Sequence, residues 1–415
     1  MPAADVRCPT TLAPPQPATA AGCRRAWALT LLLLAQVVYG QSPQPFPAPD
    51  LDLWQAGAVF AVEPDGSGGY YVAGSFTQLA RQPRASIGQV LADGSLNPAF
   101  APTVGGEVHS LVRLSDGSLL VGGQFSQING LGRANLARLD ASGNLVDSWT
   151  PTTNGRVDRL HLDASGTLYV GGDFTVIGGV VRTRLARLDV ESGVVDPAWA
   201  PSANSAVEAI AVTSDNRVWI GGSFTFLNGV SANRLARLDA AGAIDLVLSA
   251  NATVNQLQVD AADNVYACGL FTTINTVSRP QLIRINPAGA VQSWGPATNA
   301  SITDCELDAD GLYLTGRFSQ VGSAPRQGVA RLLPGGTLDP AFVLSTRGPY
   351  GGTMLESNNV VIARTGPDQV VVGGFLTFAN GQPRAGVVAA NAVDGSLRPA
   401  LDAEDRKSTR LNSSH

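Results

Sequence analysis

Residue types that carry out most enzyme chemistry are scarce in this 415-residue chain. It has three histidines, His109, His161 and His415, and neither a His-x-x-x-His pair nor a Cys-x-x-Cys pair occurs. Zinc sites and Ser-His-Asp triads are built around such residues, and a glycine-rich phosphate loop is also missing. The turn Asp308-Ala-Asp310-Gly311 resembles a calcium loop but lacks the further ligands, so we interpret it as a hairpin turn. We therefore expect no catalytic residues, no metal site and no cofactor.

Polar side chains open a series of short apolar segments, and they are the best candidates for a binding site. These candidates are His109, Asp158, Arg159, Glu208, Asn255 and Asp304. If the segments are the first strands of successive repeats, the six side chains form a rim at one end of the fold. The residue type at this position differs from segment to segment. Such variation is expected for a specific ligand site and equally for a rim that is exposed to solvent. We expect any ligand to bind at this rim.

Three of the rim residues, Asp158, Glu208 and Asp304, are carboxylates. Enzymes that cleave glycosidic bonds commonly use pairs of carboxylates, and such pairs have no local signature in a sequence. A carboxylate-dependent polysaccharide hydrolase or lyase therefore stays open as an alternative function.

An arginine stands three residues before a later apolar segment in most repeats. The six arginines are Arg84, Arg133, Arg182, Arg279, Arg326 and Arg384. A ring of guanidinium groups could hold an anionic ligand. The alternative is one structural contact per repeat, with a carboxylate or with exposed carbonyl groups, and we favour this alternative because a ligand rarely needs six equivalent contacts.

Two cysteines, Cys268 and Cys305, remain once the N-terminal segment is set aside. An even number of cysteines in an exported protein suggests a disulfide. Two buried free thiols are the other interpretation, because a sequence does not give the distance between two residues.

The elements that position all these residues are repeats with a period of about 48 residues. The strings AGSF, GGQF, GGDF, GGSF, CGLF and TGRF end at Phe76, Phe125, Phe174, Phe224, Phe271 and Phe318, and a degenerate copy ends at Leu376. Each unit contains four short apolar segments separated by turns such as Asp-Gly and Ser-Gly, which are typical of hairpins. Four strands in such a period indicate a propeller blade, whereas a solenoid would carry one strand per 20–29 residues.

The fold class is therefore predicted to be all-β, a β-propeller of seven four-stranded blades, with eight as the alternative. Hydrophobic residues make up 44% of the chain, charged residues only 15%, and there are 46 glycines, which favours strands and turns over helices. Residues 50–54 and 394–401 both resemble the last strand of a blade, so an N-terminal strand could close the ring.

Aromatic residues recur once or twice in each unit, as in Phe125, Phe174, Phe224, Trp149, Trp199 and Phe342. Each sheet of a propeller must bury both faces against its neighbours, so we interpret these rings as blade-to-blade packing. Stacking on a carbohydrate is the alternative role.

The two ends of the chain differ from the repeats. Arg24-Arg25 precede an apolar run over 26–38, which predicts a signal peptide over 1–40 and a proline-rich linker over 41–50. An uncleaved membrane anchor is the alternative. The propeller is then expected over 51–404. Residues 405–415 hold the only lysine, Lys407, and resemble a translated sequencing adapter, so we interpret them as an artefact and expect the natural chain to be longer.

The combination of Asp-Gly, Val-Gly-Gly-x-Phe, Asn-Gly-x-x-Arg, Leu-Ala-Arg-Leu and Gly-x-Leu-Asp-Pro-x-Phe resembles the delta-60 repeat. The clearest copies are 122–149, 171–199 and 315–342, and the resemblance covers about 51–401. It implies a bacterial β-propeller domain of unknown function, often found in large secreted or surface-attached proteins. It implies no catalytic residues.

These observations lead to a functional hypothesis. The formal net charge is −5, which gives no basic footprint for nucleic acid, and no membrane span is expected once the signal is cleaved. We expect a secreted or cell-surface bacterial protein that acts as a binding, adhesion or scaffold module with a glycan or protein partner. The polysaccharide hydrolase or lyase is one alternative, and a structural spacer in a longer protein is another.

Overall fold

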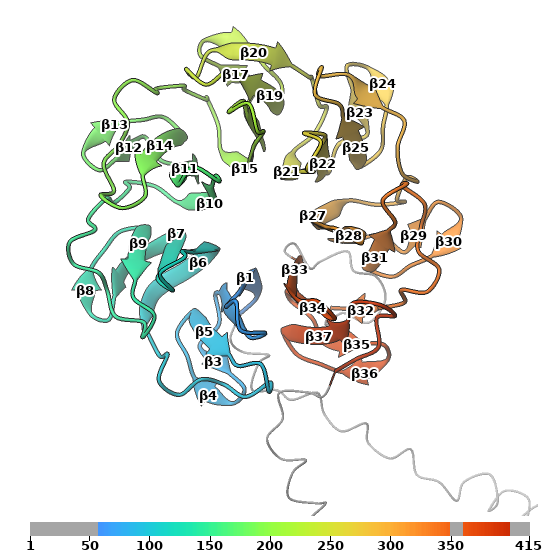
Figure 1. The fold of residues 1–415 in the computed structure, drawn as a ribbon, viewed down its shortest axis with the longest axis horizontal. Helices are drawn as coiled ribbons and strands as arrows, with labels where there is room; N and C mark the ends of the chain where they lie inside the picture. Colours follow the sequence, from blue (N-terminus) through green and yellow to red (C-terminus); the bar gives the residue numbers. More distant parts are fainter. Residues whose placement is uncertain (1–56, 349–359, 399–415) are drawn as a thin grey trace, which may run out of the picture. The chain divides into compact units, whose positions relative to one another are not determined.

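The structure is a computed structural model that describes residues 57–348 and 360–398, all within the compact unit Pro49–His415. The predicted signal peptide, linker and tail, and the strand predicted at 50–54, lie outside the described residues. Every regular element in the described part is a β-strand. The strands form antiparallel sheets arranged around a common axis (Figure 1), so the all-β propeller fold is confirmed.

Seven sheets within the described residues share one strand order and are called blades 1 to 7. Blades 1 to 3 are β1 (Val59–Pro64), β2 (Tyr70–Gly74) and β5 (Ile87–Val90); β6 (Val104–Arg113), β7 (Leu119–Ile128) and β9 (Leu136–Leu139); and β10 (Val157–Leu162), β11 (Thr167–Gly172) and β14 (Leu185–Asp189). Blades 4 and 5 are β15 (Val207–Val212), β16 (Val218–Gly222), β19 (Leu235–Leu238) and β20 (Ile244–Val247); and β21 (Val254–Val259), β22 (Val265–Gly269), β25 (Leu282–Ile285) and β26 (Val291–Gln292). Blades 6 and 7 are β27 (Ile302–Asp308), β28 (Gly311–Gly316) and β31 (Val329–Leu332); and β33 (Val361–Gly366), β34 (Gln369–Gly373) and β37 (Val387–Asn391).

A small hairpin at the periphery follows the second strand of each blade (Figure 1). The hairpins are β3 (Gln78–Leu79) with β4 (Gln82–Pro83), the end of β7 with β8 (Leu131–Gly132), β12 (Val176–Ile177) with β13 (Val180–Val181), β17 (Phe226–Leu227) with β18 (Val230–Ser231), β23 (Thr273–Ile274) with β24 (Val277–Ser278), β29 (Gln320–Val321) with β30 (Ala324–Pro325), and β35 (Phe378–Ala379) with β36 (Gln382–Pro383), which β32 (Thr346–Arg347) joins.

The predicted fourth strand is complete in blades 4 and 5 only. In the other five blades it is reduced to a single bridge, such as Val90 with Leu96 or Leu188 with Val195. In blades 1 and 3 a proline, Pro98 or Pro197, follows the bridging residue by two positions. Proline has no N–H to donate, so the ladder stops there.

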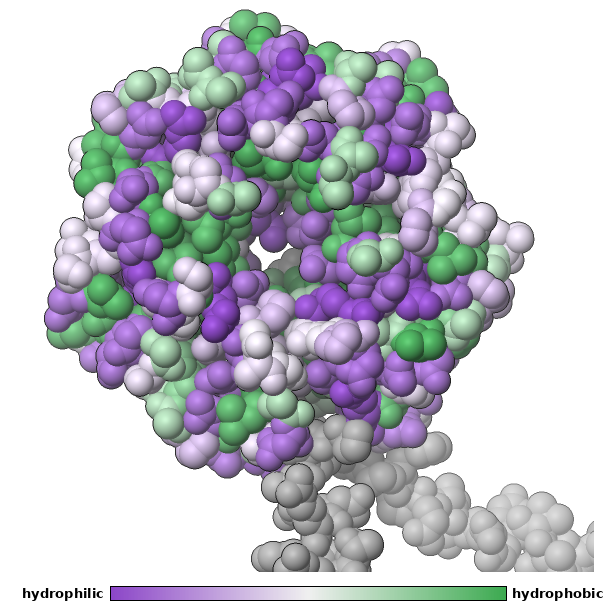
Figure 2. Space-filling view, viewed as in Figure 1, coloured by the Kyte–Doolittle hydropathy of each residue, from purple (hydrophilic) through white to green (hydrophobic). Residues whose placement is uncertain are grey.

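The first and last of these blades pack together. Strand β1 of blade 1 lies beside β33 of blade 7 as well as beside β6 of blade 2. Val59 and Val72 of blade 1 share a buried cluster with Val371 and Val387 of blade 7. The ring therefore closes within the described residues. Figure 2 shows an opening at its centre, bordered by both hydrophilic and hydrophobic residues.

Aromatic side chains fill the spaces between neighbouring blades, as predicted. Trp149 of blade 2 and Phe174 of blade 3 are fully buried in one cluster with residues of both blades. Trp199 lies in the next cluster, and its ring meets the Tyr169 ring edge-on at 5.5 Å. These rings are core residues and are not available for stacking on a carbohydrate.

The second glycine of each Gly-Gly-x-Phe motif is fixed by a β-bulge at the start of the same blade's inner strand. In blade 3 the register shifts between Val157 and Arg159, so one extra residue is inserted opposite β11. A Cβ on Gly172 would lie 2.2 Å from the carbonyl oxygen of Arg156, which no side chain could accept. The motif thus encodes the bulge, and the bulge turns two successive residues of the inner strand toward the axis.

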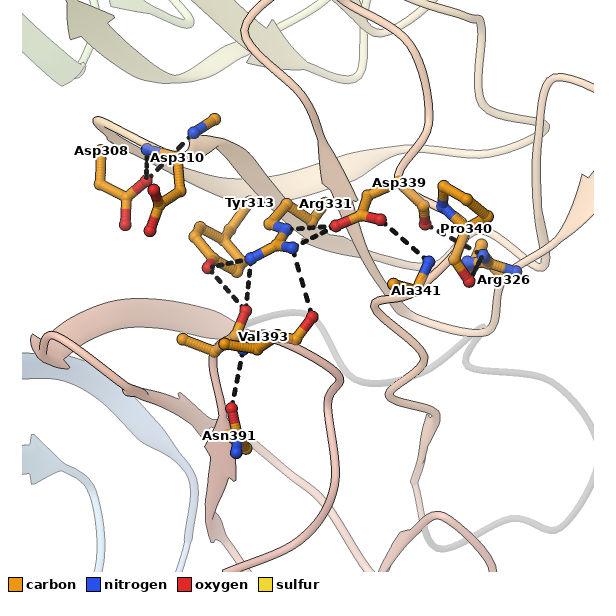
Figure 3. A network of polar contacts seen from close by, with 12 residues as sticks. Asp308, Asp310, Tyr313, Arg326, Arg331, Asp339, Pro340, Ala341, Asn391 and Val393 are labelled. Carbon is orange, nitrogen blue, oxygen red and sulfur yellow. Dashed lines mark hydrogen bonds and ion pairs between the residues drawn. The ribbon is translucent and has the colours of Figure 1, made fainter.

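Arginines of the Leu-Ala-Arg-Leu motif tie blades 2, 3, 4 and 6 to the blade that follows each of them. In blade 6 the buried Arg331 donates to Asp339 of its own blade through Nε at 2.7 Å, and to the carbonyl oxygen of Ala392 in blade 7 at 2.5 Å (Figure 3). It also donates to the carbonyl oxygen of Val393 and to the hydroxyl of Tyr313. The same reach to the following blade is made by Arg138 to Val190, Arg187 to Ala240 and Arg237 to Pro287.

We predict that Arg331→Ala destabilises the propeller by about 3 kcal/mol. The variant leaves Asp339, itself buried, without a counter-charge, and it removes one donor each from the carbonyl groups of Ala392 and Val393 in blade 7. Urea unfolding followed by tryptophan fluorescence measures the loss.

The matched control is Arg384→Ala, because within residues 57–348 and 360–398 the guanidinium group of Arg384 donates to exposed oxygens of Pro383 and Gln382. It should change the free energy of unfolding by about 0.5 kcal/mol or less. Equal losses of unfolding free energy in both variants would show that the contacts of Arg331 with blade 7 do not stabilise the fold more than the exposed contacts of Arg384 do.

Candidate functional site

A cavity of about 1340 Å³ occupies the centre of the ring and is lined mainly by the inner strands of the blades. The inner strands are β1, β6, β10, β15, β21, β27 and β33 (Figure 1). The outward side chains of these strands pack into the cores between blades, whereas the inward side chains face the cavity. The site is therefore formed by positions that the repeat framework leaves open to variation.

The six polar residues predicted to form a rim all line this cavity. They are His109, Asp158, Arg159, Glu208, Asn255 and Asp304, and each lies at or next to the bulge of its inner strand. The signal that found them was their place at the start of the first strand of each repeat, 14 to 16 positions before the phenylalanine of the partner strand. We call these six residues the rim.

Two carboxylates of neighbouring blades, Asp158 and Glu208, influence each other in the rim. Asp158 accepts a hydrogen bond of 2.5 Å from Nε of Arg156. Desolvation raises the pKa of Asp158, and the Arg156 charge opposes this shift. Desolvation also raises the pKa of Glu208, and the Asp158 charge adds to the rise. Both groups therefore hold their protons more tightly than free carboxyl groups do.

His109 forms the aromatic side of the rim. Its ring stacks on Phe60 with centroids 4.9 Å apart, and its Nε2 lies 3.2 Å from a carboxylate oxygen of Glu107. Burial lowers the pKa of His109, and the charges of Asp158 and Glu107 act in the opposite direction.

Arg159 donates from Nε to the carbonyl oxygen of Glu208 at 3.2 Å. Its positive charge also lowers the pKa of both Asp304 and Glu306 in blade 6, against the larger effect of their burial. The guanidinium group thus acts across the cavity from blade 3 to blade 6 without a close ion pair.

The carboxylate of Asp304 accepts hydrogen bonds from residues of three blades, so it has a structural role. It accepts hydrogen bonds from Nε2 of Gln256 in blade 5 at 2.8 Å, from its neighbour Cys305 at 2.9 Å and from the backbone of Ile362 in blade 7 at 3.0 Å. Asn255 is also tied, since its Nδ2 donates to the carbonyl oxygen of Ile302. These two rim residues join blades 5, 6 and 7 and offer few free atoms to a ligand.

A second layer of polar residues was missed by the sequence analysis. It contains Glu63, His161, Gln258 and Glu306, which face the cavity two or three positions further along their strands. The equivalent positions in other blades hold Val112, Ala211 and Ala363. Only the register of the repeats could have identified this position, because no single residue type recurs there in all blades.

The second layer contains the strongest pKa shifts in the cavity. Burial raises the pKa of Glu63 to about 7 and that of Glu306 to about 8, and the charges of Asp304 and Glu63 contribute to the rise at Glu306. Gln258 donates to Glu306 at 3.0 Å. Burial and the Arg159 charge lower the pKa of His161 to about 4, so this ring is neutral at pH 7.

The six repeated arginines do not line the cavity; they stand beside the peripheral hairpins. Arg182 donates to the carbonyl oxygens of Val181, Asp196 and Pro197, and Arg326 donates in the same way to Pro325, Asp339 and Pro340. The corresponding carbonyl contacts of the others are Arg84 with Pro83 and Asn97, Arg133 with Gly132 and Asp147, Arg279 with Ser278, and Arg384 with Pro383. The guanidinium groups of these arginines therefore form structural hydrogen bonds with carbonyl groups.

Cys268 and Cys305 are both buried free thiols and lie in the same apolar cluster. The acidic turn at Asp308 is a hairpin turn between β27 and β28, in which the carboxylate accepts from the backbone N–H of Asp310 at 2.7 Å and from that of Gly311 at 3.1 Å.

Comparison with protein families matches five segments of the chain to a domain of unknown function, the DUF5122 β-propeller. The segments are residues 114–145, 164–198, 213–246, 262–291 and 309–342. These five segments are DUF5122 β-propeller repeats. The resemblance to the delta-60 repeat is confirmed, because each segment covers one of the predicted repeats. No curated protein sequence matches this DUF5122 propeller.

Among the solved structures that resemble the DUF5122 propeller is another β-propeller. The WD40 β-propeller domain of Doa1 is 12% identical over 77% of this chain and 90% of its own, with a TM-score of 0.52. Virginiamycin B lyase from Staphylococcus aureus is 14% identical over 76% and 91%, with a TM-score of 0.48. An extracellular domain from B. thetaiotaomicron is 16% identical with a TM-score of 0.46; the match covers 81% of this chain and only 38% of that one.

Within the described residues of the DUF5122 propeller, no helix is long and apolar enough to span a membrane.

The DUF5122 propeller should lose stability as the pH rises from about 6.5 to 8. Below about 6.5 the lowered pKa of His161 acts in the opposite direction, because this ring is neutral in the folded chain and protonated in the unfolded chain. Glu63 and Glu306 bind protons more tightly in the folded chain than in the unfolded chain, whose glutamates titrate near 4.5. Folding is therefore favoured below that pH, and each group removes up to about 1.4 kcal/mol per pH unit until it is ionised in the folded state. Glu306→Gln should flatten the slope and stabilise the chain at pH 8.

Urea midpoints from pH 5 to pH 8.5 test this expectation, with Glu63→Gln and the double variant measured beside Glu306→Gln. The double variant should be the least dependent on pH. Parallel curves for all four proteins would contradict the assignment of these two groups.

Proposed function

We propose that the DUF5122 propeller is a secreted or surface-associated binding module whose ligand enters the central cavity. The observation that carries this proposal is the contrast between the two kinds of position in the repeat. Packing positions repeat from blade to blade, as in the buried Phe125, Phe174 and Phe224. The rim position of the cavity varies between blades, as in His109, Asp158 and Glu208. Export is supported by the signal-like segment at residues 1–40.

The charge of the cavity favours a cationic partner. Eight carboxyl side chains line it, namely Glu63, Asp158, Asp163, Glu208, Asp260, Asp263, Asp304 and Glu306, against the three guanidinium groups of Arg156, Arg159 and Arg317. A cation would lower the mutual repulsion that raises the pKa values of Glu208 and Glu306. Of the two partner classes, a protein with a Lys/Arg-rich segment thus fits better than an acidic glycan.

An array of basic, neutral and acidic peptides, together with neutral and acidic glycans, tests the proposal. Basic peptides should bind saturably, with an affinity that falls as salt rises. Glu208→Gln should weaken this binding by about tenfold, since it removes a partly desolvated charge from the rim. The matched control is Glu191→Gln, an exposed glutamate outside the cavity, which should bind like the parent chain. Absence of saturable binding to every probe would overturn the proposal.

A polysaccharide hydrolase or lyase is the second candidate, and the coupled pair Asp158 and Glu208 favours it. Two neighbouring carboxyl groups with raised pKa values can divide the roles of acid and base between them. Asp304, the third carboxylate of this hypothesis, is less suited because its oxygens are already bonded to blades 5, 6 and 7.

Assays of reducing ends and of unsaturated products on a panel of polysaccharides test this second candidate. Activity, if this function is right, should fall at least about a hundredfold in both Asp158→Asn and Glu208→Gln. It should persist in Asp304→Asn molecules that stay folded. Equal activity in parent and Glu208→Gln proteins would exclude this pair as the catalytic groups.

A further inference from the structure

Two cysteines on neighbouring blades meet in a buried core. Cys268 lies on β22 of blade 5 and Cys305 on β27 of blade 6, and both are fully buried in one apolar cluster. Strands β22 and β27 pack against each other, and both residues are free thiols. They are the two cysteines of the described residues. The pair therefore spans the boundary between two blades that otherwise interact without a covalent link.

The repeats show what normally occupies these two positions. Cys268 replaces the first glycine of the Gly-Gly-x-Phe motif, and Cys305 replaces the aliphatic residue that follows the bulge of the inner strand, such as Leu160 or Ile210. These two positions also lie close together between blades 3 and 4. A Cβ on Gly171 of blade 3 would lie 3.0 Å from Cδ1 of Ile210 in blade 4.

The same contact recurs between blades 2 and 3. A Cβ on Gly122 would lie 3.3 Å from Cδ1 of Leu160. At the boundary of blades 5 and 6, the usual glycine and long aliphatic side chain have both been replaced, by two short thiol side chains that fill the same place. Either replacement alone would change the packing at this boundary, since one adds atoms to a crowded position and the other removes them.

We propose that Cys268 and Cys305 form a disulfide between blades 5 and 6 when the chain folds in an oxidising compartment. The thiolate of one cysteine attacks an oxidant of the disulfide class, such as glutathione disulfide, and releases one thiol. The second cysteine thiolate then attacks the mixed disulfide and releases the other thiol. Two electrons and two protons pass from the protein to the oxidant, so two protein thiols and one disulfide become one protein disulfide and two small thiols.

The bond forms before the two blades pack fully. In the folded, reduced chain both thiols are closed to solvent, and burial raises the pKa of each, which keeps the reactive thiolate scarce. An oxidant therefore reaches these residues only while blades 5 and 6 are open. Once formed, the crosslink restricts the unfolded chain between the two cysteines and raises the unfolding temperature.

Refolding the full chain with and without an oxidant tests the proposal. The denatured, reduced protein is refolded in a glutathione redox buffer or in dithiothreitol, then digested without reduction and examined by mass spectrometry. The oxidised sample should contain a crosslink between the peptides of Cys268 and Cys305, with Cys8 and Cys23 identified on peptides of their own. Its unfolding midpoint should be higher by several degrees. The protein folded in dithiothreitol should stay reduced when glutathione disulfide is added afterwards.

The matched control is the double variant Cys268→Gly with Cys305→Leu, which restores the residue types of the other repeats. It should fold and have the same midpoint with and without the oxidant. The mass spectrum of the parent chain decides the matter even if this variant does not fold. The proposal is wrong if both cysteines of the oxidised, folded parent are alkylated after denaturation, or if either is crosslinked to Cys8 or Cys23 instead.

Discussion

The structure depends on one constraint: each blade must bury both of its faces, and only its neighbours can cover them. The buried clusters accordingly contain residues of two adjacent blades, as where Trp149 of blade 2 packs with Phe174 of blade 3. A blade alone would expose two apolar faces, and a ring with a gap would expose the two clusters beside the gap. Val59 and Val371, more than 300 positions apart in the chain, meet for this reason. The arginine of each Leu-Ala-Arg-Leu motif adds a polar contact to the same boundary, because it reaches carbonyl groups that the next blade leaves unpaired.

Radial packing of the blades also creates the cavity. Strands that run beside a common axis are held apart by the width of the sheets around them, so their inward side chains do not meet. Carboxyl groups placed there are partly removed from water without being covered by apolar neighbours, and burial is the largest cause of the raised pKa values of Asp158, Glu208 and Glu306. The bulge that the glycine motif requires turns extra residues toward this space. Stability and a polar central site therefore arise from the same geometry.

The repeated glycine and aromatic residues were enough to predict the propeller, because their spacing reports the register of the strands. That register also placed the rim, since a residue such as Asp158 lies at the start of the first strand of its repeat. The second layer could not be found in this way. Its positions hold Glu63 and Glu306 in two blades but Val112 and Ala363 in others, so no pattern of residue type marks them. Similarly, Arg331 looks like the outward polar residue of an alternating strand, and only the approach of blade 7 shows that it is buried.

The second layer also shows which cavity residues the fold does not need. Ala211 and Ala363 occupy the same positions as Glu63 and Glu306 and complete their blades without a charge. A glutamate there must be desolvated, and a second one nearby adds repulsion, so both weaken the folded state at neutral pH. An uncharged side chain is thus the more stable choice, and the framework uses it in blades 4 and 7. Side chains that destabilise the folded state are expected at functional positions. Packing alone would have favoured alanine, so packing does not account for Glu63 and Glu306.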